Sequence, residues 1–214
     1  MTLIIAVDGP AASGKGTIAA RLALTYGLPH LDTGLLYRAV GARLLAQGLS
    51  LDDETAATEA ARGLDASGLS DDPGLTTGEA GEAASRVASF TGVRSALLDL
   101  QQAFAAQAGG AVLDGRDIGT VIAPDAPAKL FVTATPEVRA TRRWKQLAAR
   151  GSDISFEDML ADIQRRDERD AGRGAAPMVQ ADDAVLLDTT DMGIEAAFDA
   201  ARRIVEAARA KHGL

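Results

Sequence analysis

The chain has 214 residues, a formal net charge of −8 at pH 7 and no cysteine. The acidic balance disfavours a nucleic-acid-binding surface, and the lack of cysteine excludes disulfides, thiolate metal sites and a cysteine nucleophile. Hydrophobic residues make up 47% of the sequence, which is enough for the core of one α/β domain over residues 1–214. The sequence shows neither a secretory signal nor a membrane span, so we expect a cytoplasmic protein without a membrane partner.

Short apolar runs alternate along the chain with longer segments of helical periodicity. The runs suit strands buried on both faces, and we expect strands at residues 3–7, 30–32, 111–114, 129–134 and 184–187. We expect helices at residues 18–26, 34–47, 52–62, 79–89, 93–107, 136–149, 155–171 and 193–211, with a glycine-rich loop that lacks strands at 63–78. This alternation predicts an α/β fold in which a mostly parallel five-stranded sheet carries helices on both faces.

Three residues are expected to mark helix starts. Thr33 is a candidate N-cap for the helix after the second strand, and Pro136 suits a first helical turn. Ser155, followed three residues later by Asp158, forms a variant of the capping box and predicts the start of the seventh helix.

The glycine-rich turn after the first strand, GPAASGKGT, organises the chain. A strand before it and a helix after it give the context of a phosphate-binding loop, or P-loop, rather than an ordinary strand-to-helix turn. Glycines let backbone N–H groups approach phosphate oxygens, and Lys15 adds a mobile charge for the β- and γ-phosphates of ATP. The expected ATP-binding residues are Gly9, Pro10, Ala11, Ala12, Ser13, Gly14, Lys15, Gly16 and Thr17.

One position of this loop departs from the general pattern. Gly16 follows Lys15 where Ser or Thr ordinarily supplies a hydroxyl to Mg²⁺, and the hydroxyl comes one residue later, at Thr17. We therefore expect Mg²⁺ to be held mainly by water and substrate phosphates, as this ion tolerates well. Asp114, at the end of the third strand, either orients a metal-bound water or only caps its loop.

Arginines form two stripes within residues 139–173. The first stripe is Arg139, Arg142 and Arg143, which share one helical face, and the second is Arg166, Arg169, Asp170 and Arg173. Two arginine-bearing helices joined by a break at Gly151 suit a lid that closes over phosphates. Acidic residues are interleaved with the arginines, so the alternative is a set of exposed ion pairs of little energetic value.

The segment Asp114-Gly115-Arg116-Asp117 directly follows the third predicted strand. Ligands of open α/β sheets bind beyond the carboxyl ends of strands, so Arg116 and Asp117 are well placed to contact one. The alternative is that Asp117 only pairs with Arg116 within the loop. His30, in the second strand, is expected to be structural.

Five segments of the chain resemble bacterial cytidylate kinases in sequence and in order. They are VDGPAASGKGTIA, LDTGLLYR, ASRVASFTGVRSALL, LDGRDIGTVIAPDAPAKLF and QRRDERDAGRGAAP. They span about residues 4–177, and LDTGLLYR and DGRDIGTVIAPDA are far more specific than the P-loop alone. The resemblance implies the adenylate-kinase-like architecture of nucleoside monophosphate kinases and a monomeric protein.

The resemblance also implies roles for individual residues. Those near the nucleoside monophosphate are Thr33, Tyr37 and Arg38, with Arg38 on its phosphate. Those that read cytosine are Ser85, Arg94 and Asp117, because a carboxylate with hydrogen-bond donors complements the edge of that base. Arg116 and Arg173 are expected on phosphate, and Arg166 and Asp170 at the ribose. The expected catalytic residues are Lys15, Arg116, Arg173, Arg166 and Arg142.

Three of these residues also have a simpler interpretation. Thr33 could serve only as a helix cap, Tyr37 as an aromatic at the edge of the core, and Ser85 as an incidental helix residue.

The sequence therefore predicts phosphoryl transfer from ATP to CMP or dCMP with Mg²⁺ as cofactor. A core of residues 1–62, 90–148 and 174–214 would carry a monophosphate-side flap at about 63–89 and a lid at about 149–173. Longer members of the family carry a small β-containing insert in the flap, and the short segment 63–78 predicts weaker closure. The alternatives are a kinase for UMP, AMP or a small metabolite, and a nucleotide-dependent regulatory P-loop protein.

Overall fold

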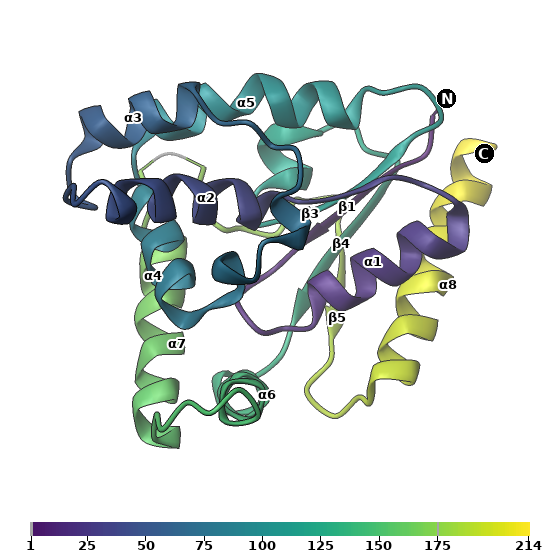
Figure 1. Cartoon of the computed structure of the whole chain (residues 1–214). Helices are drawn as coiled ribbons and strands as arrows, with labels where there is room; N and C mark the ends of the chain where they lie inside the picture. The colour runs from purple at the N-terminus through teal and green to yellow at the C-terminus, as the bar shows by residue number, and fades with distance from the viewer. Residues whose placement is uncertain (1, 175) are drawn as a thin grey trace.

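Five parallel strands form the central sheet of the computed structural model, in the order β2-β3-β1-β4-β5 (Figure 1). The structure describes residues 2–174 and 176–214. The strands are β1 (Ile4–Asp8), β2 (His30–Asp32), β3 (Ala111–Gly115), β4 (Ala128–Thr133) and β5 (Val185–Asp188). Buried residues predominate in β1, β3 and β4, as strands covered on both faces require. The five predicted strands and their parallel pairing are confirmed.

Eight α-helices and three short helical turns connect the strands in the described part of the chain. The α-helices are α1 (Lys15–Tyr26), α2 (Thr33–Ala46), α3 (Glu54–Arg62), α4 (Gly78–Val87), α5 (Thr91–Ala105), α6 (Pro136–Ala148), α7 (Phe156–Ala171) and α8 (Ile194–His212). The short turns are η1 (Leu69–Asp71), η2 (Pro73–Thr76) and η3 (Ile118–Ile122). Residues 63–78, all of them described, contain η1 and η2 and no strand, as the sequence predicts.

Helices cover both faces of the sheet (Figure 1). On one face, α1 and α8 pack on alternate residues of β1 and β4, including Ile5, Val7 and Leu130. On the other face, α5 and η3 pack on Ala6 and Leu113. This alternation along β1 follows from the two-residue period of a strand.

Two further apolar clusters lie beyond the sheet. Helices α2, α3, α4 and α5 share one of them, and α6 and α7 share the other, which also includes Ala11 of the P-loop. The Trp144 indole N–H donates to the Ile154 carbonyl at 3.0 Å and ties α6 to the α6–α7 connection. Helices α6 and α7 are thus packed as a unit against the phosphate loop.

Two of the three predicted helix starts are confirmed. Pro136 begins α6, and Ser155 caps α7 by accepting from the Asp158 N–H at 3.1 Å. The prediction for Thr33 is wrong, because Asp32 is the N-cap of α2 and accepts from the Gly34 N–H at 2.9 Å. The hydroxyl of Thr33 instead donates to the Asp114 carbonyl at 2.8 Å, which joins α2 to the end of β3.

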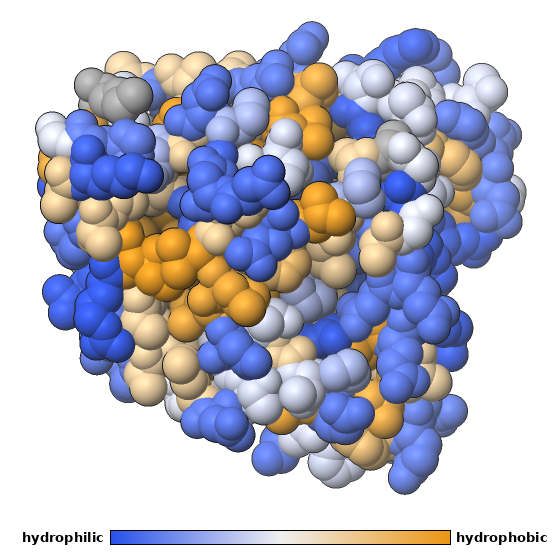
Figure 2. Space-filling view, turned by 180° about the vertical axis from the view of Figure 1, so that it is seen from behind, coloured by the Kyte–Doolittle hydropathy of each residue, from blue (hydrophilic) through white to orange (hydrophobic). Residues whose placement is uncertain are grey.

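The rear of the molecule carries an apolar area within a largely hydrophilic surface (Figure 2). Exposed apolar side chains include Val185 and Leu186 of the edge strand β5, which are 47% and 54% exposed. Among the described residues, no helix has the length and apolarity that crossing a membrane requires.

The contact between α2 and α4 predicts a stability effect at Gly41. A Cβ at this position would lie 2.6 Å from the Ala83 Cβ. Overpacking costs about 1–3 kcal/mol, which exceeds the roughly 0.5–1 kcal/mol that alanine gains in a helix. We expect Gly41→Ala to lower the free energy of unfolding by about 1 kcal/mol in urea titrations. Gly78→Ala is the control, since an added Cβ there meets nothing within 4 Å. Equal losses in both variants would contradict this close packing.

Candidate active site

The turn between β1 and α1 has the backbone of an anion-binding loop. Gly9, Ala12 and Gly14 have positive φ angles of 144°, 60° and 93°. A Cβ on Gly9 would lie 2.0 Å from the Val132 carbonyl oxygen, so only glycine fits. Helix α1 has neither a side-chain cap nor an acidic residue in its first turn, all of which is described. Its N-terminal N–H groups therefore remain available to a phosphate.

Lys15 lies at the head of this helix with its charge incompletely balanced. Its Nζ is 4.0 Å from Asp114 Oδ1. Burial and the neighbouring Arg116 lower the pKa of Lys15 to about 8, although Asp114 and Asp32 oppose the shift. A bound phosphate would supply the missing negative charge.

Two carboxylates lie beside Lys15 at the ends of neighbouring strands. Asp32 and Asp114 are register partners in the β2–β3 pair. Burial and the charge of Asp114 raise the pKa of Asp32. Paired hard oxygen donors beside a phosphate loop fit Mg²⁺ held through water. No cluster of three or more metal-ligating side chains occurs in residues 2–174 and 176–214.

His30, which was expected to be only structural, contacts this group. Its Nε2 lies 2.8 Å from Asp114 Oδ2. Parallel pairing of β2 with β3 brings the two side chains together. This contact could be predicted only from the order of the strands in the sheet, which the sequence alone does not determine.

A second group of residues lines a cavity next to Lys15, beyond the carboxyl end of β3. All ten side chains predicted to bind the nucleoside monophosphate line this one cavity. They are Thr33, Tyr37, Arg38, Ser85, Arg94, Arg116, Asp117, Arg166, Asp170 and Arg173. They come from α2, α4, α5, the loop after β3, and α7 with the turn that follows it, so five distant parts of the chain meet here.

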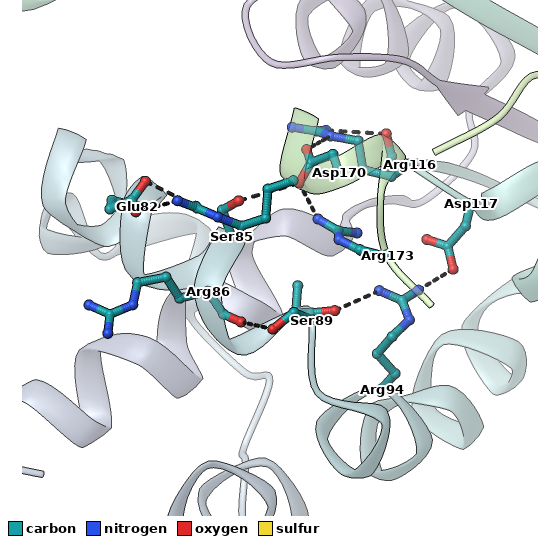
Figure 3. Close-up of polar contacts among 12 residues, drawn as sticks. Glu82, Ser85, Arg86, Ser89, Arg94, Arg116, Asp117, Asp170 and Arg173 are labelled. Carbon is teal, nitrogen blue, oxygen red and sulfur yellow. Dashed lines mark hydrogen bonds and ion pairs between the residues drawn. The ribbon is translucent and has the colours of Figure 1, made fainter. Parts of the chain in front are cut away.

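A buried ion pair occupies one end of the cavity. Arg94 of α5 pairs with Asp117, and both side chains are at least nine-tenths buried (Figure 3). The Arg94 guanidinium also lies 5.6 Å from the centre of the Tyr37 ring. The expected alternative, in which Asp117 pairs with Arg116, is wrong. The pair presents a carboxylate and a guanidinium side by side, which is the polarity that cytosine requires.

Asp170 forms the centre of the second network in the cavity (Figure 3). It accepts from Arg116 Nε at 2.9 Å, from Ser85 Oγ at 3.3 Å and from Arg173. Burial opposes ionisation of this carboxyl, but Arg116 and Arg173 hold its pKa below the ordinary value. Arg116 and Arg173 are therefore fixed by one buried carboxylate.

Two arginines in the cavity have no acidic partner. Arg38 and Arg166 form no ion pair within residues 2–174 and 176–214, and the buried Nε of Arg166 has no hydrogen-bond partner. Burial and the charge of Arg116 lower the pKa of Arg166 to about 10. Arg38 donates to the carbonyls of Leu75 and Thr77 at 2.8 and 3.4 Å. Uncompensated buried positive charge indicates a binding place for an anion.

The arginines of α6 point in different directions and do not share one role. Arg139 is buried and pairs with Asp167, with one contact of 3.0 Å, so it holds α6 to α7. Arg142 donates to the Ser13 carbonyl at 3.2 Å and to the Thr189 hydroxyl at 3.0 Å, beside the P-loop. Arg139 therefore forms a buried ion pair rather than the exposed one of the alternative, whereas Arg142 lies beside the P-loop.

A second cavity, of about 570 Å³, lies beside the P-loop. Arg142 lines it together with Thr189, Met192 and Ile194, which follow β5. The last three residues were not predicted from the sequence. Their position beyond the carboxyl end of a predicted strand was the only available signal.

A parallel α/β sheet with a P-loop that faces an arginine-lined acceptor cavity defines a P-loop kinase. The sequence model of the family "Cytidylate kinase" matches residues 5–208. The chain is 67% identical to the cytidylate kinase of Caulobacter vibrioides (strain NA1000 / CB15N), over all of both chains. It is 68% identical to that of Xanthobacter autotrophicus (strain ATCC BAA-1158 / Py2), over 97% of this chain and 99% of the relative. The chain belongs to the cytidylate kinase family.

More distant solved structures share the fold. An unliganded sugar kinase from Janibacter sp. HTCC2649 matches with a TM-score of 0.54 and 17% identity, over 96% of this chain and 95% of that chain. An uncharacterized protein from Eubacterium ventriosum ATCC 27560 matches with a TM-score of 0.56 and 12% identity, over 97% and 99%. At these identities the likeness concerns architecture alone.

The lowered pKa of Lys15 predicts pH-dependent binding of a nucleoside triphosphate. As the pH rises through about 8, the free protein loses the positive charge at Nζ, so the affinity should fall. We expect the Kd for ATP, measured by calorimetry from pH 6.5 to 9.5, to rise about tenfold per pH unit above 8. Lys15→Arg should abolish this limb, because arginine stays protonated. A flat wild-type profile would contradict the role of Lys15.

The unpaired charge of Arg166 predicts a stability gain on its removal. Replacing a buried ion by an apolar side chain is often neutral or stabilising, so Arg166→Met should raise the free energy of unfolding by about 1 kcal/mol. Arg173→Met is the matched comparison and should lower it by about 1–3 kcal/mol, because Asp170 loses a partner. Urea titrations at pH 7.5 measure both. Losses of equal size would show that Arg166 is compensated in solution.

Proposed function

We propose that this chain transfers the γ-phosphoryl group of ATP to CMP and dCMP, forming ADP and CDP or dCDP. The single observation that carries this proposal is the pairing of two features in one cavity. Arg38 and Arg166 supply positive charge without a carboxylate, and the Arg94–Asp117 pair supplies base-reading groups beside it. A phosphate monoester of cytidine has both complementary parts.

The donor is assigned to the P-loop side. The N–H groups at the head of α1 and Lys15 would hold the β- and γ-phosphates, and Arg142 would reach the same end from α6. The base of ATP would occupy the hollow beside Met192 and Ile194. Mg²⁺, bound with ATP, would neutralise phosphate charge, and Asp32 and Asp114 would hold its waters.

The acceptor is assigned to the arginine-lined cavity. Arg38, Arg116 and Arg173 would orient the CMP phosphate, and Arg166 would stabilise charge on the transferring group. An oxygen of that phosphate attacks the γ-phosphorus while the bond to the β,γ-bridging oxygen breaks, and ADP leaves. The attacking oxygen is already anionic, so the transfer needs no general base.

Base selection would rest on Asp117, Arg94 and Ser85. The carboxylate of Asp117 can accept from the cytosine amino group, and Arg94 can donate to the ring acceptors. UMP carries a carbonyl oxygen where CMP has its amino group, so it would face the carboxylate with a second acceptor. Asp170 would contact the sugar, which is ribose in CMP and deoxyribose in dCMP.

The flap at 63–89 and the lid at 149–173 would close over the substrates. Arg143 and Arg150, at the end of α6, already reach across to the Thr76 carbonyl at 3.4 and 3.3 Å. Such closure excludes water and suppresses hydrolysis of ATP. By the family resemblance, we also propose that the protein acts as a monomer in the cytoplasm.

The test is a coupled ADP-release assay with MgATP and a panel of CMP, dCMP, UMP, AMP and GMP. We expect kcat/KM for CMP to exceed that for UMP, AMP and GMP at least tenfold, which is about 1.4 kcal/mol in transition-state binding. A preference for another monophosphate would overturn the base assignment. ADP release that ignores every acceptor would instead support a regulatory P-loop protein.

The same assay on Asp117→Ala isolates the base-reading pair. We expect kcat/KM for CMP to fall about 10²-fold, because a charged hydrogen bond worth roughly 1.5–3 kcal/mol is lost. The rate with UMP should change little, so the CMP/UMP ratio should fall at least tenfold. Asp183→Ala, which removes an exposed carboxylate paired with Lys129, is the control and should keep the wild-type ratio. Equal losses for both substrates would contradict base reading by Asp117.

A further inference from the structure

Asp8 connects the phosphate loop to the loop that carries Arg116 and Asp117. It is the last residue of β1 and directly precedes Gly9. Its carboxylate accepts from the N–H of Ile118 at 2.8 Å and from that of Gly119 at 2.7 Å. These residues lie 110 and 111 positions away in the sequence and begin η3. One side chain therefore joins the ends of two strands.

The two amide groups depend on Asp8 for their hydrogen bonds. Asp117, at the head of η3, provides no side-chain cap to this turn. Ile118 is fully buried in the apolar cluster under the sheet, and Asp8 is 5% exposed. Burial leaves water little access to these donors, and an unsatisfied buried N–H is costly. Asp8 thus caps η3 from another strand.

The charges that face Asp8 come from the η3 loop itself. Burial is the main cause that raises the pKa of Asp8 to about 6, and the charge of Asp117 acts in the same direction. The hydrogen bonds from the two amides and the charge of Arg116 oppose this shift. From β4, Lys129 contributes only its aliphatic stem, since its Nζ bonds to Pro124 and Asp183. An ionised carboxylate is costly at such a depth unless it is hydrogen-bonded, so Asp8 has a task there. That task is to accept two N–H bonds, which needs the ionised form.

We propose that Asp8 is a positioning residue that fixes Arg116 and Asp117 relative to the phosphate loop, so that the acceptor is aligned with ATP. Asp8 lines neither substrate cavity and acts only through η3. The residues before η3 line the acceptor cavity, whereas the residues after Asp8 form the donor loop. The proposal rests on the proposed function, because it assigns the acceptor to that cavity.

Asp8→Asn tests this proposal with little change in shape. An amide keeps one acceptor oxygen but turns an NH₂ group toward the second N–H. We expect the KM for CMP to rise at least tenfold, the KM for ATP to change less than threefold, and the CMP/UMP ratio to fall. Asp183→Asn is the matched control and should match the wild type. Equal changes in both KM values, or none, would overturn the proposal.

A double-mutant cycle shows whether Asp8 acts through the base-reading loop. In an Asp117→Ala background, one of the two positioned groups is already absent and only Arg116 can be misplaced, so Asp8→Asn should raise the KM for CMP clearly less than it does in the wild-type background. A full tenfold rise in that background would mean that the two residues act independently and would contradict the proposal. Wild-type turnover of CMP in the same assay reports on the proposed function separately.

The pH dependence gives a second readout. Phosphates titrate near pH 6 themselves, so the measured quantity is the ratio of KM for CMP between Asp8→Asn and the wild type. As the pH falls from 7.5 to 5.5, the wild-type carboxylate is protonated and the ratio should approach one.

If Asp8→Asn does not fold, hydrogen exchange of residues 115–123 in the wild type replaces the kinetic measurement. Protection there, corrected for intrinsic rates, should fall below pH 6 relative to residues 4–8; a constant ratio in either experiment would overturn the proposal.

Discussion

Buried positive charge that lacks a matching carboxylate is the constraint around which the cavity at the carboxyl ends of the strands is built. Elsewhere in the described structure, arginines such as Arg21, Arg139 and Arg169 are matched by acidic partners and hold helices together. At the acceptor cavity, Arg38 and Arg166 are not matched, although the chain as a whole is strongly acidic. The fold tolerates this cost because α2, α4 and α5 pack on one another through an apolar cluster, of which only an edge that includes Tyr37 and Ala84 lines the cavity.

The few carboxylates at this cavity pair with different cations and so have different tasks. Asp170 holds two arginines in place, and Asp117 holds one while keeping the polarity that a base can read. Asp114 contacts His30 with one carboxylate oxygen and lies near the Lys15 ammonium with the other. Each acid therefore orients cations without neutralising the whole site, which is the arrangement expected for transfer of a highly charged group.

The sheet could be predicted because each strand is a short apolar run, and buried parallel strands have few other sequence requirements. The acceptor residues came from the family resemblance, and the structure brings all ten to one cavity. What failed depends on tertiary partners. Thr33 bonds to the Asp114 carbonyl rather than capping α2, and Arg139 leaves its predicted group because Asp167 of α7 is adjacent. Spacing places side chains on a helix face, but it does not choose their partners.

Contacts of η2 with Arg38 and Arg143 connect the acceptor cavity to the flap at 63–89. Arg38 bonds to the carbonyls of Leu75 and Thr77, and Arg143 bonds to those of Thr76 and Thr77. These neutral acceptors satisfy arginines whose charge remains uncompensated. A phosphate is a stronger acceptor for a guanidinium than a carbonyl is, so a bound monophosphate would exchange with η2 rather than add to it. Arg38, which is proposed to bind the phosphate, therefore also holds η2, and this gives the short flap a contact with the cavity without a strand of its own.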